Sequence, residues 1–339
     1  ENFVHISEAV HISDSIFRHR HLCSFLEMQE STDDISEVII GRATRIEENV
    51  SIRGNVHIGR GCLVRANSIV RSDIPDYCLA EGNPARVIEA FSAKTGTWQS
   101  VADEEELRAL LRERKETRPI LTYGIITYNR SKYLKKSLKS VLEQVGNDEL
   151  VEVLVSDNCS EDDTKEVVQE FQKKYKNLRY HCNETNVGAE GNIHAALRHS
   201  KGEYVVTAGD DDYLADGMLY LVIDYISRHR DMGIIFMTNR TDELFLPACE
   251  GAGYADYILR VGCYMTWITC IVMNKDAYLS IQDPQRYNYT HIPQVYLQMG
   301  ILKRKPRYAI LRGAFLASGG GDHPASGFNF MEVFVKNYF

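Results

Sequence analysis

The sequence lacks any long hydrophobic run. No apolar stretch approaches the roughly 18 residues that a transmembrane helix needs, and the longest stretches have the length of a β-strand. The positively charged and apolar regions of a secretory signal peptide are also missing at its start. We therefore expect at most a peripheral association with a membrane. The numbering begins at Glu1 rather than at a methionine, which leaves open whether residues precede it.

Paired cysteines and an excess of positive charge are absent as well. The eight cysteines form no C-x-x-C pair and no zinc-ligand spacing. Most of them lie in apolar runs, where a thiol behaves as a small hydrophobic group, so a reducing, cytoplasmic setting is expected. The formal net charge of −8 argues against a nucleic-acid polymer as partner.

A six-residue repeat dominates the first ninety of the 339 residues. Aliphatic residues recur at a constant spacing of six, at Ile40, Ile46, Ile52, Ile58, Val64 and Val70. Small or β-branched residues stand two positions before each of them. Ile6 and Ile12 follow the same rule before residues 17–37 interrupt it. Such a hexapeptide repeat predicts a parallel β-helix. An ordinary β-sandwich is the alternative, although its strands would alternate with a period of two.

The end of this region resembles the hexapeptide-repeat acyltransferases. The matching segments are residues 66–70, 73–75 and 82–88. The resemblance implies that residues 1–90 form a left-handed β-helix that assembles as a homotrimer. It also implies that acetyl-CoA lies along the subunit interface, where a loop histidine deprotonates the acceptor hydroxyl.

The interrupting loop contains the run Arg18-His19-Arg20-His21. By the resemblance, His19 is the catalytic base of an O-acetyltransferase and His21 is the second choice. The repeats fill only about three coils, and Arg18 stands where the family has an asparagine. The region is therefore interpreted either as a trimerisation module, with His19 a surface residue, or as a second active site that uses acetyl-CoA.

Residues 91–118 separate this region from the rest of the chain. Leu107, Leu110 and Leu111 place a single apolar stripe on a charged helix. We expect a solvated connecting helix here.

From residue 119 onwards, strand-like and helix-like segments alternate. The expected strands are 120–127, 151–156, 178–182, 203–208 and 233–238. Between them, Ser131 is expected to cap one helix, Ser160 to begin a second, and a third to follow Asn192. This alternation predicts an α/β domain over residues 119–339 with a mostly parallel sheet covered on both faces.

Three consecutive aspartates, Asp210 to Asp212, follow the fourth of these strands. Like charges placed together cost free energy unless a positive group neutralises them, and carboxylate oxygens suit Mn²⁺ or Mg²⁺. A solvated loop whose first aspartate caps the next helix is the alternative.

Polar residues also follow the other strands, and ligands bind beyond the carboxyl ends of strands in such sheets. They are Thr127, Tyr128, Asn129 and Arg130 after the first strand, Asp157 and Asn158 after the second, and Asn186, Gly188 and Asn192 after the third. The glycine-rich motifs of dinucleotide and P-loop sites are absent. The pattern therefore favours a nucleotide held by side chains, with its diphosphate bridged by a metal on the triplet.

Residues 120–225 resemble the family 2 glycosyltransferases of GT-A fold. The resemblance rests on the segments 127–130, 156–160, 186–188 and 209–212. It implies inverting transfer of a sugar from a UDP- or GDP-linked donor. The donor would be bound by the polar residues that follow the first three strands, together with Asp210 and Asp211. Asp212 and Asp210 would then bind the metal, with His323 as a late further ligand. His323 in a mobile surface loop is the alternative.

The base that accepts the acceptor proton is not assigned by any motif. Asp256 is favoured among carboxylates in suitable segments, and the others are Asp242, Glu243 and Asp322. Trp267 is expected either to stack on an acceptor sugar or to lie in the core. Both resemblances are typical of capsule and O-antigen synthesis, which implies a glycan or lipid-linked glycan acceptor and a cytoplasmic enzyme, with the inner face of the bacterial cell membrane as an alternative. A carbohydrate-binding scaffold without turnover is the remaining interpretation.

Overall fold

The computed structural model describes residues 5–6, 11–13, 37–239 and 248–317. The chain divides into two compact units, Glu1–Glu116 and Thr117–Phe339. Several residues singled out above lie outside the described residues: His19, His21, Asp242, Glu243, Asp322 and His323.

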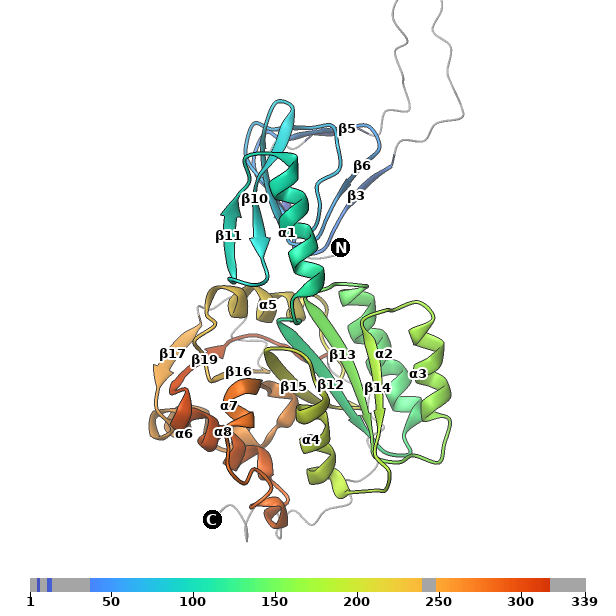
Figure 1. The fold of residues 1–339 in the computed structure, drawn as a ribbon, viewed down its shortest axis with the longest axis vertical. Helices are drawn as coiled ribbons and strands as arrows, with labels where there is room; N and C mark the ends of the chain where they lie inside the picture. The colour runs from blue at the N-terminus through green and yellow to red at the C-terminus, as the bar shows by residue number, and fades with distance from the viewer. Residues whose placement is uncertain (1–4, 7–10, 14–36, 240–247, 318–339) are drawn as a thin grey trace, which may run out of the picture. The chain divides into compact units, whose positions relative to one another are not determined.

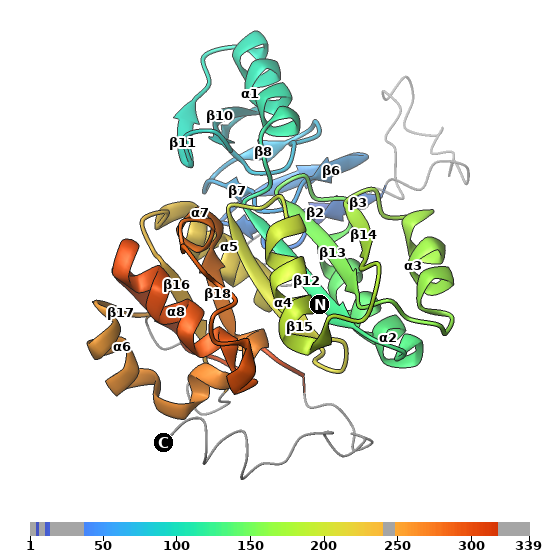
Figure 2. The same cartoon turned by 60° about the horizontal axis from the view of Figure 1, so that its bottom comes forward.

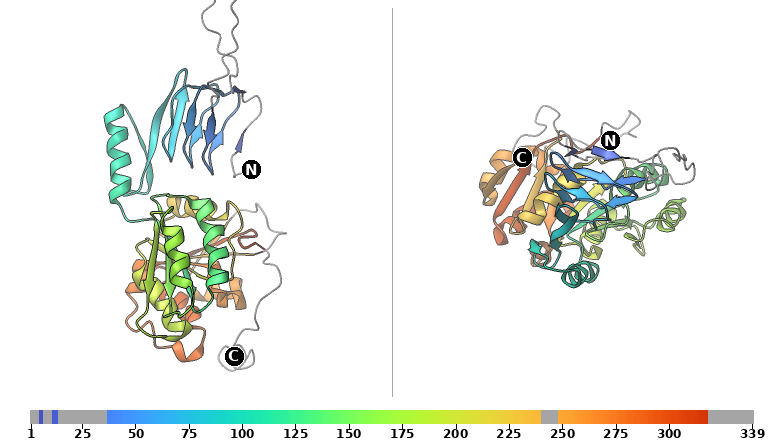
Figure 3. Two further views of the ribbon diagram at one scale, coloured as in Figure 1. Left: turned by 90° about the vertical axis from the view of Figure 1, so that its right-hand side faces the viewer. Right: turned by 90° about the horizontal axis from the view of Figure 1, so that it is seen from above.

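The first unit begins with short parallel strands that stack in three sheets (Figure 3). One sheet contains β1 (His5–Ile6), β4 (Arg45–Ile46) and β7 (Leu63–Val64), and continues into β9 (Cys78–Gly82). The second contains β2 (His11–Ser13), β5 (Ser51–Arg53) and β8 (Ile69–Val70). The third contains β3 (Val38–Ile40) and β6 (Val56–Ile58). Three parallel sheets built from successive hexapeptides confirm the predicted parallel β-helix.

The register of the strands shows one coil for every three hexapeptides. Asn49 and Asn67, 18 residues apart, stack at one corner with a 2.8 Å hydrogen bond between their side chains. Both have positive φ, a conformation that asparagine adopts more readily than most residues. His5 pairs instead with Arg45, 40 residues on, which leaves an insertion of 22 residues between the first two coils. This insertion agrees with the interruption seen in the repeat.

Both six-residue series point into the β-helix. The aliphatic series is fully buried from Ile46 to Val70. The preceding small residues are buried too, at Thr44, Val50, Val56, Cys62 and Ser68. Two side chains per hexapeptide therefore fill the interior, rather than the single one that the aliphatic repeat indicates.

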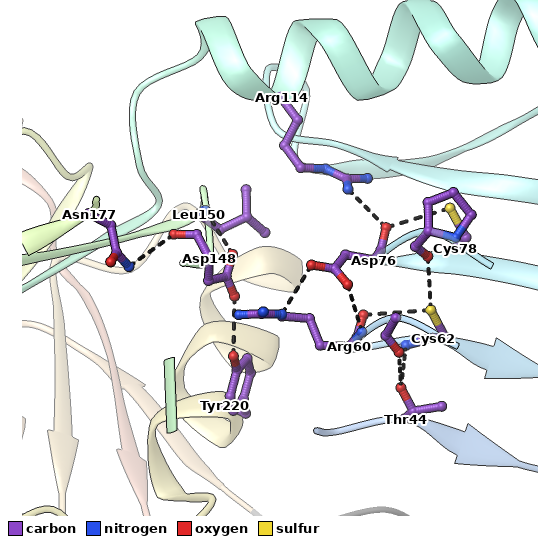
Figure 4. Close-up of polar contacts among 12 residues, drawn as sticks. Thr44, Arg60, Cys62, Asp76, Cys78, Arg114, Asp148, Leu150, Asn177 and Tyr220 are labelled. Atoms are coloured by element: carbon purple, nitrogen blue, oxygen red, sulfur yellow. Dashed lines mark hydrogen bonds and ion pairs between the residues drawn. The ribbon is translucent and has the colours of Figure 1, made fainter. Parts of the chain in front are cut away.

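The first unit ends in an antiparallel extension and a helix. Strand β9 pairs with β10 (Ala85–Ser92), which pairs with β11 (Thr97–Ser100). Helix α1 (Glu104–Glu116) packs Leu107 and Leu110 against the core of the β-helix. Arg114 of this helix is buried and donates to the carbonyl oxygen of Asp76 (Figure 4). The expectation of a solvated connecting helix was therefore wrong, because α1 covers the core of the first unit.

The second unit is built on an eight-stranded sheet in the order β14-β13-β12-β15-β18-β16-β19-β17 (Figure 1). Its parallel part comprises β12 (Leu121–Thr127), β13 (Val151–Asp157), β14 (Leu178–Cys182) and β15 (Tyr204–Gly209). The remainder comprises β16 (Ile234–Met237), β17 (Cys249–Ala252), β18 (Ile271–Asn274) and β19 (Arg307–Leu311). Strand β18 is antiparallel to both neighbours. The sheet is thus mixed, and the predicted α/β fold preceded by a hexapeptide repeat is confirmed.

Helices cover both faces of this sheet (Figure 2). They are α2 (Ser131–Val145), α3 (Thr164–Gln172), α4 (Gly188–His199), α5 (Met218–Arg228), α6 (Tyr254–Val261), α7 (Lys275–Leu279) and α8 (Pro293–Arg304). Three 3₁₀ turns, η2 (Gly262–Thr266), η3 (Ile268–Cys270) and η4 (Asn288–Thr290), lie between the later elements. Side chains from α4, α6, α7 and α8 share one hydrophobic cluster with β15, β16 and β18.

Three predicted helix starts were wrong. Ser131 is the first residue inside α2 rather than its cap, and its backbone N–H donates to Asp162 Oδ2 at 2.9 Å. Helix α3 begins at Thr164 instead of Ser160, because the side chain of Ser160 bonds to Asp157. Asn192 lies inside α4 instead of before it. None of the helices among the described residues combines the length and the apolar character needed to cross a bilayer.

Candidate active site

The ends of β12 and β15 bring together two segments that are far apart in the sequence. The two strands are parallel neighbours, with Ile126 opposite Gly209. The hydroxyl of Thr127 therefore reaches Asp210, to whose Oδ2 it donates at 2.7 Å. The first strand-end motif and the aspartate triplet thus form one site at the carboxyl edge of the sheet, where α/β sheets bind their ligands.

Arg130 supplies positive charge to the triplet. Its Nη2 donates to Asp211 Oδ2 at 2.7 Å, and its Nη1 lies 3.3 Å from Asp210 Oδ1. The guanidinium also stacks 4.6 Å from the ring centroid of Tyr133. Arg130 therefore neutralises part of the charge that we expected a metal alone to balance. Burial opposes the charge on Arg130, yet its bond to Asp211 and the charge of Asp210 leave its pKa raised.

Asp210 is the buried member of the triplet. Burial raises the pKa of its carboxyl to about 6, against the lowering effects of Thr127 and Arg130. Both of its oxygens have protein partners. This arrangement favours a role in fixing Arg130 and the strand ends over the predicted role as a metal ligand.

The other two aspartates of the triplet form a candidate metal-binding pair. A Cβ added to Gly209 would lie 3.0 Å from Asp211 Oδ1 and 3.5 Å from Asp212 Oδ2, so two carboxylates converge over this glycine. Asp212 Oδ2 also accepts hydrogen bonds from Thr269 and, at 3.3 Å, from Trp267 Nε1. Within the described ranges, no group of three or more His, Cys, Asp or Glu side chains is placed to hold a metal. A site with one or two carboxylates still fits Mg²⁺ or Mn²⁺, because substrate phosphates usually complete the shell.

Asp157 ends the neighbouring strand and is fully buried. Its Oδ1 accepts from the hydroxyl of Ser160 at 2.6 Å, and its Oδ2 accepts from the hydroxyl of Tyr180 at 2.5 Å. Burial and this bond to Asp157 raise the pKa of Tyr180. Asp157 lies at the predicted rim, but in this structure its oxygens hold the surrounding loop.

Asn158 and Asn192 connect the strand ends through their amides. Asn158 Nδ2 donates to Asn186 Oδ1 and to the carbonyl of Gly188, and its Oδ1 accepts from the backbone of Val187. Asn192 Oδ1 accepts from Ser156, and its Nδ2 donates to the carbonyl of the same residue. Both side chains are buried. Their position favours a framework role over direct contact with a nucleotide.

Three further predicted residues remain accessible at this edge. The ring of Tyr128 is exposed, as a surface for stacking a base requires. Asn129 has a positive φ and ties its loop to the next one by accepting from the backbone of Glu161 at 2.7 Å. Gly188 begins α4 with a φ of +76°, which suits glycine.

Asp256 lies far from the triplet. It accepts a hydrogen bond from the hydroxyl of Tyr308, a residue at the start of β19. Tyr308 pairs with Ile234, and the paired residues of the next strands form one row across the sheet that ends at Val205. Val205 precedes Asp210 by five residues. At about 3.3 Å per residue, this row is roughly 16 Å from the triplet. The bonds from Tyr308 and Arg260 also lower the pKa of Asp256, so neither position nor chemistry favours the predicted role as base.

Several partners in the site carried no signal in the sequence. Thr269 and Tyr180 bond to two of the aspartates, but neither lies in a motif. Trp267, by contrast, was singled out in the sequence, and it is half-exposed beside Asp212 instead of lying in the core. These contacts depend on strand order, which periodicity does not encode.

Comparisons with known proteins match a family model in each unit. Residues 122–246 match the model of the family Glycosyl transferase family 2, and residues 37–72 match Bacterial transferase hexapeptide (six repeats). The abequosyltransferase RfbV of Salmonella typhimurium is 25% identical over 202 residues, 54% of this chain and 61% of that protein. A GalNAc(5)-diNAcBac-PP-undecaprenol beta-1,3-glucosyltransferase of Campylobacter jejuni is 39% identical over 102 residues, 30% of this chain and 32% of that protein. The chain therefore spans less than two thirds of either relative.

Solved structures give a weaker likeness. The structure of S. aureus TarS 1-349 in complex with UDP-GlcNAc has a TM-score of 0.48 at 21% identity, and covers 63% of this chain and 64% of that one. The strand order at the site and the family match together give the second unit a GT-A-like α/β fold with a family 2 glycosyltransferase domain. A hexapeptide-repeat region precedes it.

Proposed function

We propose that this chain, with a family 2 glycosyltransferase domain in its second unit, is a metal-dependent, inverting glycosyltransferase. It moves a sugar from a UDP- or GDP-linked donor to a glycan acceptor. The observation that carries the proposal is the meeting of Thr127, Arg130 and the aspartate triplet at the carboxyl edge of the sheet. A diphosphate needs positive charge and hydrogen-bond donors, and Arg130 provides both beside the two converging carboxylates.

A metal ion and Arg130 are both proposed to neutralise charge at the diphosphate. Asp211 and Asp212 would hold a Mn²⁺ or Mg²⁺ ion, which neutralises charge on the leaving diphosphate. Asp210, held by Thr127, keeps Arg130 in place. The exposed ring of Tyr128 would stack on the base. Asp157 lies at the same edge and would bind the ribose after its hydrogen bonds to the neighbouring loop residues are replaced.

The acceptor side is proposed to lie around Trp267. Its indole is half-exposed while its Nε1 bonds to Asp212, which places an aromatic face next to the reacting groups. Because one relative is an abequosyltransferase and another acts on an undecaprenol-linked glycan by its name, we propose a lipid-linked acceptor in bacterial surface polysaccharide synthesis. The reaction would take place in the cytoplasm or at the inner face of the membrane.

The β-helix is proposed to hold three chains together. The insertion of 22 residues between its first two coils corresponds in the sequence to the loop that contains His19. This observation supports a second candidate function, acetyl-CoA-dependent O-acetylation by the same chain. Acetyl-CoA hydrolysis that survives His19→Ala would overturn that second candidate.

The test of the proposed glycosyltransferase is release of nucleoside diphosphate from a panel of UDP- and GDP-sugars with Mn²⁺. We expect release by the wild type, its loss on chelation of the metal, and a decrease of about 100-fold or more in Asp212→Ala. Asp224→Ala is the matched control, because Asp224 is an exposed aspartate that pairs only with Arg228 of the same helix in the contacts described. No release with any donor, or equal activity in Asp212→Ala, would count against the proposal.

A further inference from the structure

A second ionisable pair lies at the same edge of the sheet and has no part in the function proposed above. His291 Nδ1 is 2.6 Å from Glu190 Oε1, although 101 residues separate the two in the sequence. Glu190 lies in the first turn of α4, and His291 directly follows η4. The Glu190 side chain is mostly buried, whereas about half of the His291 side chain is exposed.

Contacts on both sides connect this pair to the candidate active site. Glu190 lies two residues after Gly188, whose carbonyl accepts from Asn158 at the end of β13. On the other side, Gln294 of α8 donates to the carbonyl of Thr266 at 2.7 Å. The next residue, Trp267, is the one that bonds to Asp212. His291, three residues before Gln294, therefore belongs to the chain segment that contacts the region proposed for the acceptor.

Two further features of this segment point to a ligand. His291 has a φ of +60°, a sparsely populated conformation for a residue other than glycine, and such positions often occur at functional sites. Gln294, only 5% exposed, has a buried Oε1 with no hydrogen-bond partner among the described residues. An unpaired buried acceptor costs free energy, and the hydroxyl of a bound sugar could donate to it.

The chemistry of the pair defines which nitrogen is available. An ionised carboxylate only accepts hydrogen bonds, so the contact with Glu190 places a proton on His291 Nδ1. In the neutral ring, Nε2 then has a lone pair, and the ring is accessible from solvent. A histidine oriented by a carboxylate in this way is suited to general-base catalysis.

We propose that His291 is the general base of the transfer reaction and that Glu190 is its positioning residue. The inference rests on the proposed glycosyltransferase function. The acceptor oxygen forms a bond to the anomeric carbon, and the bond from that carbon to the diphosphate breaks. The nucleoside diphosphate leaves with the bonding electron pair, and the acceptor proton passes to His291 Nε2. Glu190 then stabilises the positive imidazolium.

The test uses the full chain and hydrolysis of UDP- and GDP-sugars, in which water is the acceptor. His291→Gly and His291→Asn both suit a positive φ, so neither should disturb the fold. We expect kcat to fall about 100-fold or more in each, with the dissociation constant of UDP or GDP unchanged. Imidazole added to the solution should restore activity to His291→Gly, because it replaces the missing base. Glu190→Gln should lower kcat less, and Glu190→Asp should recover part of the loss.

The matched control is His199→Asn, because His199 is an exposed histidine near the other end of α4. It should keep wild-type kcat. If the wild type hydrolyses a donor and the His291 variants keep its kcat, or lose it without rescue by imidazole, the assignment of the base is overturned while the proposed function stands. If the wild type hydrolyses none of the donors, the proposed function fails and this inference fails with it.

Discussion

Arg130 shows how one side chain changes the chemistry of the aspartate triplet. The sequence placed Arg130 among the residues that bind the donor, and in the structure its guanidinium contacts Asp210 and Asp211. Three adjacent carboxylates therefore do not depend on a metal alone for neutralisation. The buried Asp210 nevertheless keeps a raised pKa of about 6, because removal from water disfavours its charge more than Arg130 favours it.

This raised pKa predicts a pH dependence of stability. Between the ordinary value of 3.8 and about 6, the folded state binds more protons at Asp210 than the unfolded state does. Stability contributed by this group is therefore lost as the pH rises through that window, by up to about 3 kcal/mol. Asp210→Asn, which still offers an oxygen to Thr127, should lack this loss. Urea unfolding of both proteins at pH 4 and pH 7 measures the difference, and equal pH dependence would contradict it.

At the scale of elements, helix α1 and the end of the β-helix form one structure. Leu107 and Leu110 pack on the core, and Arg114 reaches below the helix to two carbonyl oxygens. These are the carbonyls of Asp76 and Phe91, at 2.8 and 3.1 Å. The helix thus covers the last coil, whose interior would otherwise be exposed to water.

Replacement of this arginine should loosen the first unit. Arg114→Met keeps an unbranched side chain but removes the guanidinium donors from the carbonyls of Asp76 and Phe91. We expect a loss of about 2–4 kcal/mol in the free energy of unfolding. Arg112→Met, at an exposed position of the same helix, should change it by no more than about 0.5 kcal/mol. Thermal unfolding followed by circular dichroism compares the two variants, and equal midpoints would show that Arg114 contributes no such stabilisation.

At the scale of the whole molecule, the chain joins a hexapeptide-repeat β-helix to the mixed α/β sheet of the second unit. Each unit has its own core and its own ladder of strands. The first unit keeps an aliphatic side chain, Ile39, exposed on β3. We place the proposed contact between copies of the chain at this residue.

The proposed assembly predicts a mass in solution. Sedimentation equilibrium should give three times the 38.7 kDa of the single chain. Ile39→Lys should weaken the assembly, because a charge would be buried at the contact. A wild-type monomer at micromolar concentration would contradict the trimer. A trimer unaffected by Ile39→Lys would place the contact on another face of the β-helix.

The sequence by itself determined the β-helix of the first unit and the α/β class of the second. A spacing of six residues has one structural solution, and the observed coils repeat it from Ile46 to Val70 with both series buried. The five predicted strands of the second unit likewise begin and end close to their expected positions, because apolar runs and turn residues are local signals. Strands β17, β18 and β19 were not predicted. The placement of Asp157 and the triplet at one edge followed from the same parallel arrangement.

Only the tertiary structure decided which side chains meet. Arg130 and Asp211 are 81 residues apart, and Glu190 and His291 are 101 apart. Asp256 was favoured as the base among carboxylates in suitable segments, but the register across β15, β18, β16 and β19 puts it at the opposite end of the sheet. Strand order and direction set these distances, and periodicity encodes neither. The residues of the site could therefore be predicted where strands end, whereas their partners could not.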